Sequence, residues 1–224
     1  DASRAVAATR SRTAKTQALA GLFARCDPTQ VGVVVSYLSG VLPQRRLGVG
    51  FRSLGSLPEP ATTPTVTVAE VDAAFERLAT PHGPGATASR RSELGALMVR
   101  ATHAEQHFLR DLITGNLRQG ALDGVVLAAI ASAYAVPAAV VRRATMLAGT
   151  AAEVATLAAE GGAASLEAVT LRVGRPVRPM LAASAKTAGE AVEALGGGDL
   201  VVDGKLDGIR IQVHRRDGQV TVYT

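Results

Sequence analysis

Apolar residues recur at helical spacing over most of this chain, and at a spacing of two only near its end. Residues 3–25 follow the helical pattern throughout. Pro28 then precedes a second apolar run, from Val31 to Leu38, which Gly40 ends. The pattern therefore predicts a helix over residues 3–25 and a shorter, strongly apolar helix after Pro28.

The middle of the chain repeats this pattern between polar loops. Thr67 and Glu70 have the spacing of a capping box, which predicts a helix that continues to Leu78. Loops rich in Gly, Pro and polar residues are expected at 42–64 and 80–88. Further helices are expected over residues 89–102, 104–114, 122–135, 137–148 and 151–160.

After the helical part, prolines, glycines and arginines over residues 172–179 are typical of a linker. A short helix is expected at 187–195, followed by a break at Gly196–Gly198. These glycines lack the Gly-Lys-Ser/Thr that would follow in a phosphate-binding loop, so we expect only a turn there.

Beyond residue 199 the alternation of apolar residues is typical of strands. Strands are expected at 200–202, 209–213 and 220–224, with a hairpin turn at Arg216–Gln219. Because the sequence stops inside this hairpin, we expect a fragment. The predicted fold is mainly α, with an all-helical domain over residues 1–174. Residues 175–224 would be a linker and the truncated N-terminal part of a second domain, contributing its first β-strands.

Composition narrows the choice of partner. Hydrophobic residues make up 47% of the chain and aromatic residues 3%, with no Trp, so Ala, Val and Leu must build the core. The net charge of +5 suits a polyanion. Residues 199–224 hold four basic and four acidic residues, so the whole excess lies in the helical part.

Two features bear on location. Cys26 is the only cysteine, which excludes an internal disulfide and fits a reducing compartment. Residues 125–141 carry no charge, but Pro137 interrupts them, so two buried helices are expected and no membrane span. We therefore expect a cytoplasmic protein without a membrane partner.

The most informative motif is Lys205-Leu206-Asp207-Gly208-Ile209-Arg210, which has the pattern K-x-D-G-x-R. On an extended strand Asp203 would lie on the same face as Lys205. Gly208 permits a ligand to approach the backbone closely, and the guanidinium of Arg210 suits a phosphate. The motif resembles motif I of the covalent nucleotidyltransferases, whose lysine amine attacks the α-phosphate of a nucleotide.

Three further segments occur in a fixed order before this motif. They are Tyr37-Leu38-x-Gly40 with Leu47-Gly48-Val49-Gly50, then Gly115-Asn116-Leu117-Arg118-Gln119-Gly120 with Val126-Leu127-x-Ala129, and finally Pro179-Met180-Leu181-Ala182. Together the four segments resemble the ATP-dependent DNA ligases, and the Ala- and Arg-rich composition resembles the bacterial enzymes of LigB type. The second domain would then be an α/β adenylation domain, ATP-grasp-like in fold.

This resemblance implies nick sealing in three steps, with ATP and Mg²⁺ as cofactors and nicked duplex DNA as the partner of a monomer. Lys205 would take AMP from ATP, and the AMP would pass to the 5′-phosphate and be displaced by the 3′-hydroxyl. Asp207 would orient the amine, and Arg210 would contact the nucleotide. Asp203 stands where the family has Glu, one methylene longer, which weakens the expected contact with adenine.

Phosphate contacts are expected at glycine-rich loops that carry arginine, because backbone amides and guanidinium groups bind phosphate without reading sequence. Arg118 and Gly120 form one such pair. Arg46, Gly48 and Gly50 belong to a second loop of this kind. By contrast, Arg90, Arg91, Arg142 and Arg143 are expected to be solvated surface charges. The scarcity of aromatic residues argues against base stacking as the binding mode.

Alternatives remain open. His103 and His107 share a helical face, but without a third ligand we expect no metal site. An RNA ligase or capping enzyme would share the lysine motif, although a long helical domain ahead of the motif speaks against both. A non-catalytic DNA-binding module is the other alternative. Even for a ligase, we expect residues 1–224 alone to bind DNA without forming an adenylate.

Overall fold

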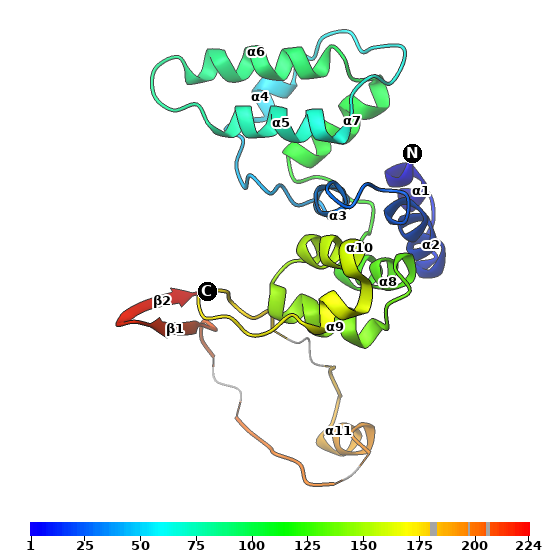
Figure 1. Ribbon diagram of the computed structural model, residues 1–224, viewed down its shortest axis with the longest axis vertical. Coiled ribbons are helices and arrows are strands. Elements are labelled where there is room, and N and C mark those ends of the chain that lie inside the picture. Colours follow the sequence, from blue (N-terminus) through cyan, green and yellow to red (C-terminus); the bar gives the residue numbers. More distant parts are fainter. Residues whose placement is uncertain (180–182, 197, 205–206) are drawn as a thin grey trace.

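In the computed structural model, which describes residues 1–179, 183–196, 198–204 and 207–224, the helical part is built around two hydrophobic cores. Figure 1 shows one group of helices at the top, a second group below it, and α3 (Val31–Leu38) between them. The bounds of the remaining helices are α1 Ala2–Ala7, α2 Arg12–Phe23, α4 Phe51–Leu54, α5 Val68–Ala79, α6 Ala86–Met98, α7 His103–Ile113, α8 Asp123–Ala133, α9 Ala138–Ala148, α10 Ala151–Glu167 and α11 Ala188–Ala194.

The first core joins both ends of the helical part. Helix α2 packs against α8, and α3 packs against α10. Phe23, Ile130 and Leu166 are fully buried there among many alanines and valines. Small residues let helices approach closely, so this core needs few aromatic side chains.

The second core lies among α5, α6, α7 and the loop that contains α4. Phe75, Leu78 and Met98 are among its fully buried side chains. Tyr37 of α3 packs into this core, whereas Val31, Val34 and Val35 of the same helix pack into the first. Helix α3 is therefore shared by both cores, which explains why its sequence is almost entirely apolar.

Helix caps confirm several predicted boundaries. Thr67 and Glu70 form the capping box expected before α5. Thr102 and Glu105 form a second box, before α7, that the sequence analysis did not identify. The helices expected on either side of Pro137 are present as α8 and α9, and the helix expected at 187–195 is present as α11.

Other predicted helix boundaries were wrong. The helix expected over 3–25 is divided into α1 and α2, because the Ser11 hydroxyl caps α2 by accepting from the Ala14 N–H at 3.2 Å. Helix α6 begins three residues before the expected Ser89. The loop expected at 42–64 contains the one-turn helix α4. Helix α10 extends past Glu160, through a kink at Gly161 and Gly162.

The sheet differs more from expectation. Strands β1 (Gln212–Arg216) and β2 (Gln219–Tyr223) form the predicted antiparallel hairpin, with Arg216 opposite Gln219. The strand expected at 200–202 is absent from the described residues, and the one expected at 209–213 begins at Gln212. Val201 is 96% exposed, and no described strand lies beside it. A strand is held by hydrogen bonds to a neighbouring strand, so the short apolar run Leu200-Val201-Val202 does not form one by itself.

Candidate functional site

The loop between α7 and α8 holds the predicted Leu117-Arg118-Gln119-Gly120 segment. Together with Leu38 and Ser39, residues 117–122 line a hollow of about 390 Å³. Arg118 is exposed. The Ser39 hydroxyl oxygen is buried and has no hydrogen-bond partner within the described residues. The loop thus presents a free guanidinium beside a concave surface.

Gln119, the residue at the variable position of this segment, ties the loop to three helices. It is only 4% exposed. Its side-chain amide donates to the Leu38 carbonyl at the end of α3, and its side-chain oxygen accepts from the Ser3 hydroxyl of α1. Its backbone carbonyl accepts from Lys15 Nζ of α2 at 2.6 Å. The segments containing Leu38 and Leu117, predicted separately, are therefore in direct contact.

Gly120 has a specific steric reason to be glycine. Its φ is +71°, and a Cβ there would lie 2.5 Å from Lys15 Nζ. A Cβ on Gly124 would likewise lie 2.6 Å from a terminal nitrogen of Arg12. Two basic side chains of α2 thus lie against the backbone of the loop and the start of α8. The sequence analysis missed this part of the site, because nothing in the helical pattern relates α2 to the loop.

The second predicted loop, which holds Arg46, Gly48 and Gly50, belongs to the second core through buried Leu47. Arg46 is exposed. Gly48 has a φ of +67°, and a Cβ there would lie 2.5 Å from Nε of Arg90. No described contact joins this loop to residues 115–120, and a Cβ on Gly50 would meet only open space.

Arg90 itself is not the solvated charge that was expected. Its Nε donates to the Leu78 carbonyl at 3.0 Å, and a terminal nitrogen donates to the Pro81 carbonyl. The guanidinium thereby satisfies carbonyls at and after the end of α5, which have no partner inside that helix. The Arg90 guanidinium also lies against the backbone of the loop at Gly48. Arg91, Arg142 and Arg143 are exposed, as expected, although Arg143 also donates to the Val169 carbonyl at 3.1 Å.

A polar network joins α3 to α5 close to the Tyr37-Leu38-x-Gly40 segment. The Tyr37 hydroxyl donates to Asp72 at 2.8 Å, and the Gln44 amide donates to Asp72 at 2.9 Å and to Glu76 at 2.8 Å. Burial, and then the bond to Asp72, raise the pKa of Tyr37, so its hydroxyl remains a neutral donor. This network fixes the end of α3 to which the Gln119 side chain is bound.

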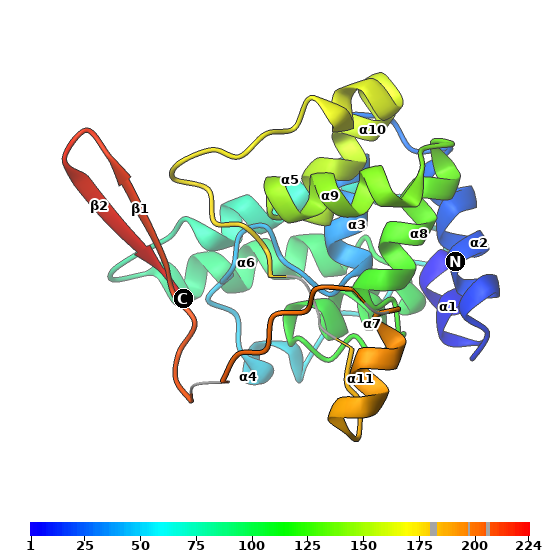
Figure 2. The ribbon, with the colours of Figure 1, turned by 90° about the horizontal axis from the view of Figure 1, so that it is seen from below.

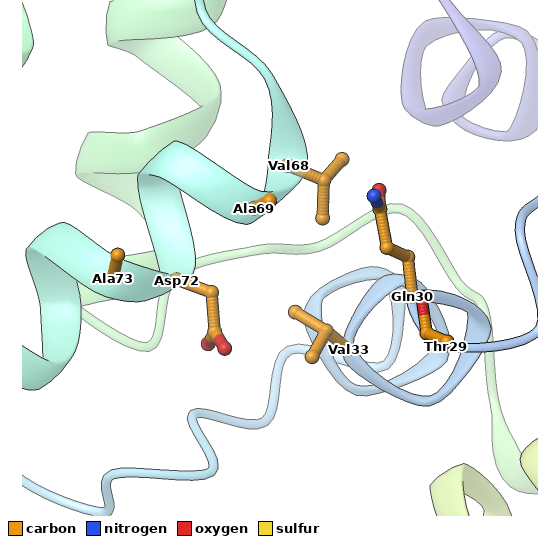
Figure 3. A pocket seen from close by; sticks show the side chains of 7 residues that line it. All are labelled: Thr29, Gln30, Val33, Val68, Ala69, Asp72 and Ala73. Carbon is orange, nitrogen blue, oxygen red and sulfur yellow. The ribbon is translucent and has the colours of Figure 1, made fainter.

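On another side of the same helices lies a second hollow, of about 300 Å³. Figure 3 shows Gln30 and Val33 at the α3 side of it, and Val68, Ala69 and Asp72 on α5. Its lining is mostly apolar and carries no basic side chain. This hollow therefore does not fit the expected phosphate contacts.

The described residues of the lysine motif, Asp207–Arg210, are exposed. Lys205 itself, like Met180–Ala182 of the preceding segment, falls outside the described residues. Asp203, Asp207 and Arg210 are all exposed, and no hydrogen bond or ion pair among the described residues joins them. The predicted site residues thus form two groups, the loops of the helical part and this segment.

The hairpin that follows the motif is attached to the linker (Figure 1). Gln212 accepts from the Val177 N–H at 2.8 Å and donates to the Val177 carbonyl at 2.6 Å. His214 Nδ1 accepts from the Gly174 N–H at 2.9 Å, and the Tyr223 hydroxyl donates to the Gly174 carbonyl at 2.7 Å. Side chains of β1 and β2 therefore form hydrogen bonds with the backbone of Gly174 and Val177, as the backbone of a neighbouring strand would.

Within the described ranges, no group of three His, Cys, Asp or Glu side chains is arranged to hold a metal ion. His107 lies 3.3 Å from Asp111, one turn further along α7. None of the described helices combines the length and the apolar character needed to cross a bilayer. We therefore assign no Mg²⁺ ligand to the described residues.

Comparison with known proteins identifies the family. A family model described as "DNA ligase N terminus" matches residues 48–131, and one described as "ATP dependent DNA ligase domain" matches residues 179–224. The first range includes the Gly48 loop and Arg118, and the second includes the lysine motif. The order of the two matches agrees with the predicted order of the segments.

Curated relatives agree with these matches along nearly the whole chain. Proteins named "Probable DNA ligase" are 52% identical in Streptomyces griseus, 52% in a Nocardioides species and 50% in a Mycobacterium species. The matches cover 98%, 99% and 98% of this chain but only 42%, 44% and 43% of those proteins. The chain belongs to the ATP-dependent DNA ligase family and spans less than half the length of these relatives.

Proposed function

We propose that this chain is the DNA-binding and nucleotide-accepting N-terminal portion of a ligase that seals nicks in duplex DNA. The helical part, residues 1–174, would bind the duplex, and residues 175–224 would be the linker and the start of the adenylation domain. The proposal that the helical part binds DNA rests on one observation. Arg118 is exposed beside a hollow, on a loop that buried Gln119 anchors. Since the relatives are bacterial, we propose that the protein acts on bacterial DNA in the cytoplasm. We also propose that it acts as a monomer.

DNA binding would rest on phosphate contacts. Arg118, with the backbone near Gly120, would take one phosphate, and Arg46 with the Gly48 and Gly50 loop would take another. The two loops belong to different cores, which α3 connects. A rigid scaffold under two separate phosphate contacts suits a protein that must accept any sequence.

In the adenylation step, the neutral amine of Lys205 would attack the α-phosphorus of ATP. The new bond would be N–P, pyrophosphate would leave with the electrons of the broken P–O bond, and the amine would lose a proton. Asp207 would orient the amine, and Arg210 would hold the nucleotide phosphate. Asp203 would recognise adenine, with a shorter reach than Glu. ATP and Mg²⁺ are the cofactors that family membership supports.

The DNA-binding half is tested by removing one guanidinium. We expect Arg118→Ala to weaken binding of residues 1–224 to a nicked duplex by about tenfold, and to reduce the slope of log K against log [salt] by about one. Fluorescence anisotropy over a salt series measures both quantities. Arg142 of α9 is also an exposed arginine, so Arg142→Ala is the control for loss of one charge.

Equal losses in Arg118→Ala and Arg142→Ala would show that only net charge matters, and would refute the loop as a contact. A wild-type chain that does not bind the duplex at all would refute the proposed function of the helical part.

For residues 1–224 by themselves, a DNA-binding role without adenylation is the second candidate. Asp203, Asp207 and Arg210 are exposed and make no described contact with one another, so nothing described here preorganises them. A labelled covalent adduct formed by residues 1–224 alone with ATP would contradict this expectation.

A further inference from the structure

Gln119 differs from the other polar residues near the proposed DNA-binding loop, because it is buried and both its side-chain nitrogen and its side-chain oxygen are hydrogen-bonded. It is one of four buried polar or charged residues among those described, the others being Ser36, Gln106 and Thr145. Buried amides are costly unless they are hydrogen-bonded, so a buried glutamine in a surface loop requires a structural reason. Its neighbour Arg118 is the residue proposed to contact DNA.

Three of the four polar groups of Gln119 each bind a different helix. Its side-chain nitrogen donates to the Leu38 carbonyl, which lies at the C-terminal end of α3 where carbonyls lack helical partners. Its side-chain oxygen accepts from Ser3 of α1, and its backbone carbonyl accepts from Lys15 of α2. The partners are 81, 116 and 104 residues away along the chain. The loop is therefore hydrogen-bonded to α1, α2 and α3, which all contribute residues to the first core.

These bonds fix the loop where Arg118 needs a fixed backbone. Within this loop Gln119 is buried, while its neighbour Arg118 is exposed. If the loop were free, binding a phosphate would require ordering it, and that entropy would reduce affinity. A loop held by these hydrogen bonds has already lost its conformational freedom on folding, so phosphate binding does not carry that entropy cost.

We propose that Gln119 is a positioning residue for DNA binding, which acts through Arg118 by holding the 117–120 loop against α1, α2 and α3. The proposal rests on the proposed DNA-binding function and adds the residue at the variable position of the Leu-Arg-x-Gly pattern. Ser3 of the N-terminal helix participates through its bond to Gln119. Contact between α1 and DNA is not required.

Gln119→Leu is the direct test, since it keeps the volume and removes both side-chain bonds. We expect this variant of residues 1–224 to bind a nicked duplex about tenfold more weakly, as expected for loss of a preorganised contact. Added to Arg118→Ala, it should cause little further loss, because Gln119 acts through the same guanidinium. The salt slope of the single variant should fall by about one, as for Arg118→Ala.

Gln106 provides a matched control. It is 6% exposed, and its amide donates to the Pro58 carbonyl at 3.1 Å and the Met98 carbonyl at 2.8 Å, in the second core. Gln106→Leu should lower the melting temperature as Gln119→Leu does, but leave the affinity and salt slope of the folded protein unchanged. A loss of DNA affinity shared equally by both variants would overturn the proposal.

Ser3→Ala covers the case in which Gln119→Leu does not fold. It removes only the bond to the Gln119 oxygen, and we expect a loss of affinity of about two- to threefold that disappears in the Arg118→Ala background. Full additivity of Ser3→Ala or Gln119→Leu with Arg118→Ala would overturn the proposal. So would wild-type affinity in Ser3→Ala together with a folded, fully binding Gln119→Leu. Failure of Arg118→Ala to change binding would instead refute the proposed function at this loop.

Discussion

At the scale of single residues, the loop that carries Arg118 is held by hydrogen bonds from Gln119 to residues of α1, α2 and α3. Arg118 and Gly120 were identified by their pattern, and both lie in the loop beside the hollow. Gln119 was not identified, because a glutamine between them carries no signal of burial. Lys15 was likewise not identified, yet its ammonium group donates to the Gln119 carbonyl of this loop. Local chemistry can be predicted from neighbouring residues, whereas a bond spanning 104 residues depends on the packing of helices.

A residue-scale prediction concerns Glu70, the acidic member of the capping box before α5. Its bond to the Thr67 N–H, and then its bond to Arg100, lower the pKa of Glu70 from 4.5 to about 2. Since the pKa is depressed in the folded state, the stability it contributes is present above pH 4.5 and is lost as the pH falls through about 2.

We therefore expect Glu70→Gln to melt at a lower temperature than wild type at pH 6, with the gap closing between pH 4.5 and 2. Thermal melts followed by circular dichroism measure this gap. Glu160→Gln is the control, because Glu160 is exposed on α10 and makes no described ion pair. A gap that is absent at pH 6, or unchanged at pH 2, would contradict the assignment.

At the scale of elements, helices with capping signals were predicted well and strands were not. Thr67, Pro137 and Thr187 each mark a helix start that depends only on nearby residues. The hairpin turn at Asp217 and Gly218 was predicted for the same reason. The segment at 200–202 is a short run of Leu and Val, as a strand can be, but a strand also needs a partner, and no described segment supplies one. Pairing is a property of two segments, which one pattern cannot specify.

The hairpin and the linker form a unit that can be tested by exchange. We expect Gln212→Ala to speed hydrogen exchange at the Val177 N–H, which Gln212 accepts at 2.8 Å, and to loosen the neighbouring Gly174 contacts. Mass spectrometry of peptides covering residues 172–179 measures this. Arg215→Ala, an exposed change in the same strand, should leave exchange unchanged. Protection that is equal in all three proteins would show that the linker is ordered without the hairpin.

At the scale of the whole molecule, the helical part has two cores that share α3. Figure 2 shows the hairpin of β1 and β2 to one side of this helical part. Composition predicted an Ala- and Val-rich interior, and the first core has that character. It did not predict a second core with Phe75, Leu94 and Met98, since helix patterns do not reveal which helices pack together. The arrangement places one predicted phosphate loop on each core. A duplex bound across both would be held at two separated points.

The lysine motif lies in the other part of the chain, where the family match to the ATP-dependent ligase domain begins. The order of the parts, first a helical unit and then the motif, agrees between sequence, structure and relatives. We propose that the first part binds DNA and that Lys205 in the second part performs the covalent step.

The most direct test of that claim is the covalent step in the longer natural protein. Incubation with α-labelled ATP and Mg²⁺, beside the Lys205→Ala variant, should give an acid-labile adduct in wild type only, which peptide mass spectrometry assigns to Lys205. Nicked-duplex binding should be equal in the two proteins, because the lysine lies outside the helical part. An adduct on another residue, an adduct that persists in the variant, or no adduct in either protein would contradict the account.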